Sequence, residues 1–388
     1  MSTPPDSYDP QRKAYKAGEH RYSIIDLLSS AFDPEYMRNG MPRISDFHIK
    51  TGEPVRFRMD QELYSVPEGE RLTQELCEDL VYPLLSEFDW KQMRDDPMAD
   101  VDSSFPLTIA DKSYNFRINA FHENDGLAAV IRLLPPFIPK LEECGFPSDR
   151  VWKHICGMQQ GLVIVSGVTG SGKSTTIASM LDAINQSSAR RVITLEDPVE
   201  YLFKSKRSLI SQRELGRHVS TFAQGLRSAL REDPDIIFVG EIRDLETASL
   251  ALAAAETGHL VFAPLHTRDA IGALTRLIDM FPAERERELS TQLSFSLAYV
   301  LSQKLVPRAD GNGRIVAMEV LRNTPQMGNF MRSRKLHQIY SAMETGGDYG
   351  MLTMERRLLE LHEEGLISRD NAIFYANRDD IIGRLPPA

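Results

Sequence analysis

The sequence predicts a two-domain α/β protein in which a small α+β domain precedes a larger domain built on a parallel sheet. A chain of 388 residues is too long for one ordinary hydrophobic core. Four prolines within residues 133–147 exclude a continuous helix or central strand there, and they indicate a boundary. Before that boundary apolar residues alternate with polar ones, whereas after it short apolar runs alternate with helical stretches.

Two segments are expected to lie outside both domains. Residues 1–20 are polar and lack the apolar core of a secretory signal, so we expect a flexible tail there. Residues 136–150 are proline-rich and are expected to form the linker. The N-terminal domain then spans residues 21–135 and the C-terminal domain residues 151–388.

In the N-terminal domain, alternating apolar residues predict short strands of a sheet that is covered on one face. One longer segment, residues 68–88, carries apolar residues at helical spacing and predicts a helix. The predicted strands are residues 55–59, 105–110, 114–121 and 127–134.

In the C-terminal domain, short runs rich in Val, Ile and Phe predict the buried strands of a parallel sheet. The predicted strands are residues 161–167, 191–197, 235–241 and 259–267. The predicted helices between them are residues 174–186, 222–232 and 244–256. Strands that alternate with helices in this order are typical of a parallel α/β sheet, and the end of the chain is expected to be mostly helical.

Composition and charge exclude several classes of function. Hydrophobic residues make up 42% of the chain, as in a globular protein. No segment approaches about 18 consecutive apolar residues, so no membrane span is expected. The three scattered cysteines argue against a zinc site or a disulfide framework and favour a reducing cytoplasm. With a formal net charge of −10, no nucleic acid partner is expected, because a phosphate backbone needs a basic surface.

The strongest functional signal lies in residues 166–176. They read SGVTGSGKSTT and match the pattern G-x-x-x-x-G-K-[ST], with a predicted strand before it and a predicted helix after it. Glycines let the backbone aim its N–H groups at phosphates, Lys173 is expected to reach the β and γ phosphates, and the Ser174 hydroxyl is expected to ligate Mg²⁺. The predicted cofactors are therefore ATP and Mg²⁺. The residues expected to bind them are Gly167, Thr169, Gly170, Ser171, Gly172, Lys173, Ser174 and Thr175.

Three further stretches place polar residues where predicted strands end, the edge at which α/β sheets carry their chemistry. They are TLEDPVEY with Glu200, PDIIFVGEIRD with Glu241, and APLHT with His266. Each stretch by itself is more often a solvated turn or a helix cap. Beside a phosphate loop, they could together orient water, hold Mg²⁺ and sense the γ phosphate. A usual P-loop ATPase ends its Walker B strand with Asp, whereas this chain has Gly240 followed by Glu241.

On these motifs, residues 161–372 resemble the PilT-type retraction ATPases, a branch of the type II and type IV secretion motor superfamily. The matching segments are GVTGSGKSTT, ITLEDPVEY, ALREDPDIIFVGEIRDLETASLALAAAETGHLVF, LHT, MFPAE, SQKLVPR and GLISRDNA. In the first domain, SDFHI, FRINAF and VIRLLP resemble segments of the same family. A glycine after the Walker B strand is normal in that family.

The resemblance implies a PAS-like N-terminal domain, a RecA-like P-loop ATPase domain with a helical C-terminal end, and a homohexameric ring that binds ATP between domains. It assigns Glu200 to the acidic box and His266 to the His box. Glu241 takes the Walker B position, where it would orient or activate water and share the metal site with Ser174.

Two arginines of the first domain also match the family. Arg117 in FRINAF and Arg132 in VIRLLP correspond to arginines that approach the triphosphate. A cation there would offset charge that develops in the transition state. Without the resemblance, either residue could equally be a solvated strand residue.

The function that the resemblance implies is a cytoplasmic motor that hydrolyses ATP to power pilus retraction and twitching motility. It would lie at the inner face of the bacterial inner membrane, peripheral rather than inserted, and act on an inner-membrane pilus platform protein. An assembly or export ATPase of a related type II or type IV secretion system is the alternative. A nucleic-acid motor and a small-molecule kinase are disfavoured, because no basic DNA-binding loop and no sign of a lid with an acceptor site is found.

Three segments depart from the family pattern. APLHT contains Pro264, whose missing N–H removes one backbone bond beside the His box. The segment linked to retraction has arginine in the family where this chain has Gly328. The region of residues 31–43 is longer than usual.

The segment that contains Gly328, residues 323–343, is expected to be helical. It could simply pack on the ATPase core. The functional alternative is that its exposed part, around Arg332, couples motion of the ring to the platform protein.

Overall fold

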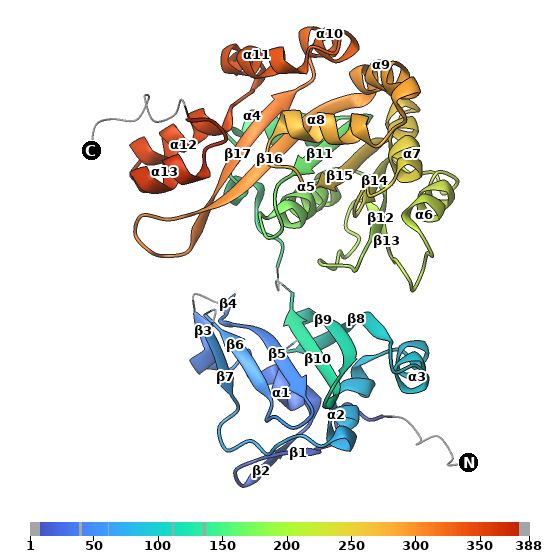
Figure 1. The fold of residues 1–388 in the computed structure, drawn as a ribbon, viewed down its shortest axis with the longest axis vertical. Helices are drawn as coiled ribbons and strands as arrows, with labels where there is room; N and C mark the ends of the chain where they lie inside the picture. Colours follow the sequence, from blue (N-terminus) through green and yellow to red (C-terminus); the bar gives the residue numbers. More distant parts are fainter. Residues whose placement is uncertain (1–7, 39–40, 61, 111, 135–136, 380–388) are drawn as a thin grey trace. The chain divides into compact units, whose positions relative to one another are not determined.

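The computed structural model divides into two compact units (Figure 1). The first comprises Met1–Phe137 with Pro198–Leu202, and the second comprises Ile138–Asp197 with Phe203–Ala388. The division falls inside the segment that the sequence analysis predicts to be a linker. The structure describes residues 8–38, 41–60, 62–110, 112–134 and 137–379.

The first unit contains an antiparallel sheet of six strands in the order β7-β6-β5-β10-β9-β8. Its strands alternate as predicted: in β9, Phe116, Ile118 and Ala120 are fully buried, and Arg117 and Asn119 between them are partly exposed. The buried residues share one core with the helices of this unit, so one face of the sheet is covered. The strands and helices are β5 (Ile44–Lys50), β6 (Arg56–Met59), β7 (Glu62–Ser65), β8 (Asp100–Ile109), β9 (Lys112–Glu123), β10 (Gly126–Leu133), α1 (Ile24–Ser30), α2 (Gln74–Val81) and α3 (Glu87–Asp95).

A hairpin of β1 (Tyr15–Ala17) and β2 (His20–Tyr22) lies where a flexible tail was expected. Tyr15 is fully buried, and its hydroxyl accepts a hydrogen bond of 3.2 Å from the Val55 N–H. Burial of one aromatic ring outweighs the polar composition around it, because a ring of this size removes a large apolar area from water. Residues 1–7 of the expected tail lie outside the described residues.

The longer region of residues 31–43 also adds to the first unit. It contains a short 3₁₀ turn, Pro34–Tyr36, followed by the paired strands β3 (Met37–Arg38) and β4 (Met41–Pro42). The Tyr36 ring packs edge-on against Phe57, with 5.8 Å between the ring centroids. These residues therefore extend the hydrophobic core of this unit.

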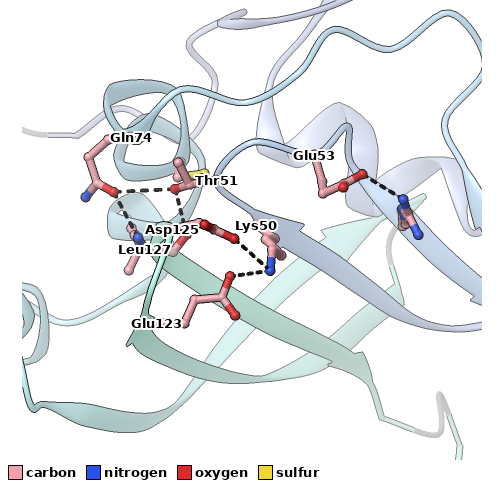
Figure 2. A network of polar contacts seen from close by, with 9 residues as sticks. Lys50, Thr51, Glu53, Gln74, Glu123, Asp125 and Leu127 are labelled. Carbon is pink, nitrogen blue, oxygen red and sulfur yellow. Dashed lines mark hydrogen bonds and ion pairs between the residues drawn. The ribbon is translucent and has the colours of Figure 1, made fainter.

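A polar network holds the β9–β10 turn against the end of β5 and the start of α2 (Figure 2). The Lys50 ammonium lies 2.7 Å from the Glu123 carboxylate and 3.2 Å from the Asp125 carboxylate. The Leu127 N–H donates to the Gln74 side-chain oxygen at 2.9 Å. Because a slip of one residue would turn every side chain of a strand to the other face, these contacts help to fix which side chains of β9 and β10 face the core.

The second unit contains a sheet of seven strands in the order β13-β12-β14-β15-β11-β16-β17. Six of these strands are parallel, and β17 at the edge runs antiparallel to β16. Alternate residues of β11 enter two cores, Leu162 and Ile164 on one face and Val163 and Val165 on the other, as a sheet covered on both faces requires. The strands are β11 (Gly161–Ser166), β12 (Arg191–Glu196), β13 (Leu209–Glu214), β14 (Ile236–Val239), β15 (Leu260–Leu265), β16 (Leu297–Pro307) and β17 (Arg314–Arg322).

Helices cover both faces of this sheet (Figure 1). Helices α4 and α5 share the core on one face, and α6 to α9 share the core on the other. Helices α12 and α13 form a smaller cluster with the β16–β17 hairpin, drawn in orange and red in Figure 1. The helices are α4 (Asp149–Gly157), α5 (Lys173–Ser187), α6 (Phe222–Ala229), α7 (Leu245–Glu256), α8 (Ala270–Asp279), α9 (Glu286–Ser296), α10 (Pro325–Arg332), α11 (Ile339–Thr345), α12 (Met354–Glu363) and α13 (Arg369–Tyr375). No helix of the described part is long and apolar enough to cross a bilayer.

The mixed α/β class is confirmed, and each predicted strand and helix of the parallel sheet has its counterpart. Three strands were not predicted: β16 and the two edge strands β13 and β17. The segment 323–343 is not one helix, because Arg334 adopts φ of +57° and a 3₁₀ turn, Leu336–Gln338, separates α10 from α11. A left-handed residue interrupts the hydrogen-bond ladder of a right-handed helix.

Candidate nucleotide site

The glycine-rich loop joins the end of β11 to the start of α5, at the carboxyl edge of the parallel sheet. Gly167, Gly170 and Gly172 have φ values of 148°, 77° and 93°, a region that favours glycine. A Cβ atom on Gly167 would lie 2.6 Å from the Gln303 carbonyl oxygen, so no larger residue fits there. The loop therefore curls closely around the first N–H groups of α5, which have no partner within the helix.

Lys173 is the first residue of α5 and only 8% exposed. Its ammonium donates to the carbonyl oxygens of Gly167 and Val168 at 2.8 and 3.1 Å, so it lies over the loop that it follows. Ser171 is 2% exposed, and within the described part of the chain its hydroxyl has no hydrogen-bond partner. A buried polar group without a partner is destabilising, and a phosphate oxygen would supply the partner. The loop thus fits a nucleotide phosphate.

Glu241 and His266 follow neighbouring strands, because β15 lies between β14 and β11 in the sheet. His266 Nε2 lies 3.7 Å from Glu241 Oε1, and Arg243 Nε donates to Glu241 Oε2 at 2.6 Å. Arg243 Nη1 also lies 3.5 Å from the carboxylate of Asp197, which follows β12. One cation therefore links carboxylates at the ends of two adjacent strands.

His266 is electrostatically connected to the phosphate loop. Burial lowers the pKa of its imidazole from 6.5, and the positive charge of Lys173 lowers it further, against an opposing effect of Glu241. The imidazole is therefore neutral at pH 7, with one ring nitrogen that donates and one that accepts. Lys173, Glu241 and His266 follow the strands β11, β14 and β15, and they thus lie together at the carboxyl edge of the sheet.

Comparison with known proteins identifies the family. The family model described as "Type II/IV secretion system protein" matches residues 23–367. The chain belongs to this family.

Relatives of this secretion-system family resemble the chain over most of its length. It is 43% identical to "Type IV pilus retractation ATPase PilT" of Pseudomonas aeruginosa, over 84% of this chain and 93% of that protein. It is 41% identical to "Twitching motility protein" of Neisseria gonorrhoeae, over 90% of each. A crystal structure of "the Pilus Retraction Motor PilT and Bound ADP" matches with a TM-score of 0.83 at 40% identity, over 93% of this chain and 99% of that chain. The expected PilT-type secretion ATPase is confirmed.

Two polar residues of β16 support the loop of this secretion-system protein, a role that was not predicted from the sequence. Gln303 Nε2 donates to Thr176 Oγ1 at 2.8 Å, and Ser302 Oγ lies 2.5 Å from Ser166 Oγ. All four residues are buried. The signal was a polar pair at the start of SQKLVPR, inside an otherwise apolar strand.

Pro264 lies in β15 where β14 has already separated from it. β15 pairs with β11 as far as Leu265, whereas its pairing with β14 ends at Phe262. The Leu260 N–H donates to Asp235 on the β14 side, and alternate residues of a strand face the same neighbour. The N side of Pro264 therefore faces the β14 side of the sheet, beyond Phe262, the last residue of β15 that pairs with β14. No hydrogen bond between the two strands is required at this position, so proline fits there.

Arg117 and Arg132 lie in the first unit, directly opposite each other on β9 and β10. Opposite residues of an antiparallel pair share one face, so the structure brings these two side chains together. Arg132 Nε donates to Asp46 at 2.7 Å, and Arg117 Nη2 lies 3.4 Å from Asp102. The Arg132 side chain is 60% exposed and that of Arg117 is 35% exposed.

The remaining predicted residues lie in separate places. Glu200 belongs to Pro198–Leu202, the segment grouped with the first unit, so its role in an acidic box stays a prediction.

Ser174 lies in the first turn of α5, next to Lys173. Among the described residues, no group of three His, Cys, Asp or Glu side chains could hold a metal ion. Mg²⁺ usually takes one or two protein ligands together with phosphates and waters, so Ser174 and Glu241 suit a site that a nucleotide completes.

Thr169 and Thr175 flank the centre of the loop. Thr169 is exposed in the turn, and Thr175 follows Ser174 in the first turn of α5. Their backbone N–H groups are the part of each residue that a phosphate would contact.

Proposed function

We propose that this chain is a motor ATPase that retracts a type IV pilus, as a homohexameric ring at the cytoplasmic face of the bacterial inner membrane. ATP and Mg²⁺ are its proposed cofactors. The observation that carries the proposal is the convergence of Lys173, Glu241 and His266 at one edge of the parallel sheet. A neutral imidazole, a carboxylate and an ammonium beside a phosphate loop suit hydrolysis of a nucleoside triphosphate.

The extent of the matches favours retraction over the assembly or export alternative. The two relatives named for retraction and twitching are matched over 93% and 90% of their own length. "Type II secretion system ATPase E" of Vibrio cholerae is 36% identical and is matched over 57% of its length. A retraction motor is therefore the nearer functional parallel.

Phosphate binding is the first proposed step. Lys173 would exchange the Gly167 and Val168 carbonyl oxygens for oxygens of the β and γ phosphates. The backbone N–H groups at the start of α5 would bind the same phosphates, since the helix N-terminus carries partial positive charge. Mg²⁺, when bound beside Ser174 and Glu241, would offset negative charge on the phosphates.

Activation of water is the proposed role of Glu241. The 3.7 Å between Glu241 Oε1 and His266 Nε2 is longer than a direct hydrogen bond. An oxygen atom placed between them could bond to both, so the pair would hold the attacking water or sense the γ phosphate. Arg243 would meanwhile orient the carboxylate through its other oxygen.

Arg117 and Arg132 would supply positive charge from the N-terminal domain at a domain or subunit junction of the ring. Both arginine side chains retain exposed surface while they contact a carboxylate. A triphosphate would compete with those carboxylates for the same hydrogen-bond donors.

The proposed partner is an inner-membrane platform protein, and the proposed contact lies around Arg332. Its guanidinium donates to Ser294 Oγ at 2.9 Å and lies 5.6 Å from the ring centre of Phe295, which is 69% exposed. A Cβ atom on Gly328 would lie 3.2 Å from that guanidinium. The missing side chain at this position therefore leaves room for Arg332 to fold over α9, beside an exposed aromatic ring that suits a protein contact.

The variant Glu241→Gln tests the proposed function. Glutamine keeps the shape but cannot accept a proton, so turnover should fall by about 100-fold or more while ATP still binds. Steady-state ATPase rates and the affinity for a fluorescent ATP analogue measure the two effects. The exposed pair of Glu288 with Arg285 provides a control, since Glu288→Gln should change neither. Normal turnover in Glu241→Gln would defeat the assignment.

The same variant separates retraction from assembly in the bacterium that carries the protein. A retraction motor without turnover leaves cells with surface pili that cannot twitch. Loss of the pili themselves would instead support the assembly alternative. Electron microscopy of the cell surface and a twitching assay on agar distinguish the two outcomes.

A further inference from the structure

A buried carboxylate away from the phosphate loop joins two helices. Glu319 on β17 is 3% exposed. Its Oε1 accepts a hydrogen bond of 2.7 Å from the N–H of Ala270, the first residue of α8, and its Oε2 accepts one of 3.3 Å from the N–H of Met354, the first residue of α12. The first N–H groups of a helix lack partners within the helix and carry partial positive charge. One carboxylate therefore satisfies two helix N-termini at once.

This carboxylate is linked through the backbone to the candidate nucleotide site. Ser166, Ser302 and Glu319 form one row across three neighbouring strands, and Ser166 directly precedes the phosphate loop. Helix α8 begins at Ala270, four residues after His266. A displacement of the His266 segment, residues 266–270, would therefore also move the Ala270 N–H, which donates to Glu319.

Burial, together with two nearby carboxylates, opposes the ionisation of Glu319. Burial, followed by the charges of Asp269 and Glu355, raises the pKa of Glu319 from 4.5 to about 7, although the two backbone hydrogen bonds lower it. Lys304 on β16 also faces this cluster, but its ammonium donates to the Tyr375 carbonyl oxygen at 2.6 Å, and burial lowers its pKa. A neutral glutamine would avoid the cost of a buried charge, but it would offer an acceptor oxygen to only one of the two helix N-termini.

We propose that Glu319 is a positioning residue that ties the His266 segment to helix α12, so that ATP turnover depends on a carboxylate that touches no nucleotide. When ionised, it accepts from both helix N-termini. When protonated, one of its oxygens carries a hydrogen and no longer serves one of the two N–H groups well. The link between α8 and α12 is then weakened. This inference rests on the proposed function, because it acts through His266.

Glu319→Gln in the full-length protein tests the link. Glutamine keeps one acceptor oxygen but turns an NH₂ group towards the other helix N-terminus. We expect kcat at pH 8 to fall about tenfold with the KM for ATP unchanged, as expected when positioning rather than binding is lost. In the wild type, kcat should rise as the pH passes through about 7, and this inflection should be absent in the variant. Wild-type kcat and an unchanged inflection in Glu319→Gln would overturn the proposal.

Glu355 provides the matched control. It is also fully buried, on α12, but it accepts hydrogen bonds from the Tyr340 hydroxyl at 2.9 Å and the Asn377 N–H at 2.8 Å. Glu355→Gln removes a negative charge near Glu319, so kcat at pH 8 should stay unchanged while the inflection moves to lower pH. If both variants lose turnover equally and neither changes the pH profile, Glu319 has only a structural role.

A measurement on the wild type covers the case in which Glu319→Gln fails to fold. Hydrogen exchange of the first turns of α8 and α12, corrected for the intrinsic effect of pH, should slow about tenfold between pH 6 and pH 8 as the carboxylate ionises. Equal protection at both pH values would contradict the proposal. Glu241→Gln separates the two hypotheses. Normal turnover in Glu241→Gln would defeat the proposed function. If Glu241→Gln turns over slowly but Glu319→Gln has wild-type kinetics, only the proposed role of Glu319 is defeated.

Discussion

The two sheets of this chain carry their charges in different places. The antiparallel sheet of the first unit has one face on the core, and Arg117 and Arg132 lie side by side across β9 and β10, the former partly exposed and the latter exposed. The parallel sheet is covered on both faces, so Lys173, Glu241 and His266 gather at its carboxyl edge.

This difference has a chemical consequence. On the face that carries the arginines, the pair of Arg117 with Asp102 is partly solvated and contributes little to stability, whereas Arg132 pairs with the buried Asp46. At the partly buried edge, burial and then the positive charge of Lys173 lower the pKa of His266. Proton transfer and phosphate binding therefore suit the carboxyl edge of the parallel sheet.

The largest expected effect is at the edge. Lys173→Ala removes the buried ammonium over the loop, so ATP turnover should fall by about 100- to 1,000-fold, as for other preorganised donors. A malachite green assay of phosphate release measures it. The control is Lys153→Ala, which removes an exposed lysine paired with Asp149 on α4 and should not change ATP turnover. If the ATP turnover of Lys173→Ala stays within tenfold of the wild-type rate, the carboxyl edge of the parallel sheet is not the phosphate site.

A smaller effect is expected on the open face. Arg117→Ala should lower turnover by at least about tenfold, since arginines at phosphoryl-transfer sites contribute up to 10³ to 10⁵ and a pair would share this effect. Its thermal unfolding should not change, because its pair with Asp102 is exposed. Arg132→Ala should lower both turnover and the unfolding temperature, because the Asp46 side chain is only 6% exposed and would lose a charged partner.

The double variant Arg132→Ala, Asp46→Asn separates the two effects of the arginine. It should recover the unfolding temperature but not the turnover. Full turnover in the variant that lacks both Arg117 and Arg132 would show that the open face supplies no charge to catalysis.

Arg332→Ala should leave turnover almost unchanged, because its partners Ser294 and Phe295 belong to α9 and not to the sheet edge. If the segment couples the ring to a platform protein, twitching of the bacterium should nevertheless decrease. Equal losses of turnover and twitching would assign the residue to the fold or to catalysis. No change in either would exclude it as the coupling surface.

The last expected effect concerns the stability of the second unit and not turnover. Folding raises the pKa of Glu319 from 4.5 to about 7, so between these values the unfolded chain releases a proton that the folded chain keeps. The contribution of this residue to the free energy of unfolding should therefore fall as the pH rises from 4.5 to 7 and stay level above. Between pH 5 and pH 7.5, the free energy of unfolding measured with urea should fall more in the wild type than in Glu319→Gln. Equal losses would place the titration of Glu319 outside this range.

Local patterns predicted much of the parallel sheet. The loop residues lie within a few positions of one another, and their chemistry depends on the glycines and the helix start that directly adjoin them. The apolar runs of β11, β14 and β15 are recognisable because both of their faces are buried. The edge strand β13 carries the sequence LISQRE, in which Leu209 is 62% exposed, so it lacks that signal.

The sequence by itself determined the phosphate loop, the alternation of the first sheet and the polar residues that end the strands, because these depend on near neighbours in the chain. Only the tertiary structure decided which distant groups meet. Gln303 reaches Thr176 across 127 positions, and Glu319 reaches the starts of α8 and α12 across 49 and 35 positions. No local pattern predicts such contacts, because they depend on strand order and helix packing, and burial gives a polar residue its functional environment only after the whole unit has folded.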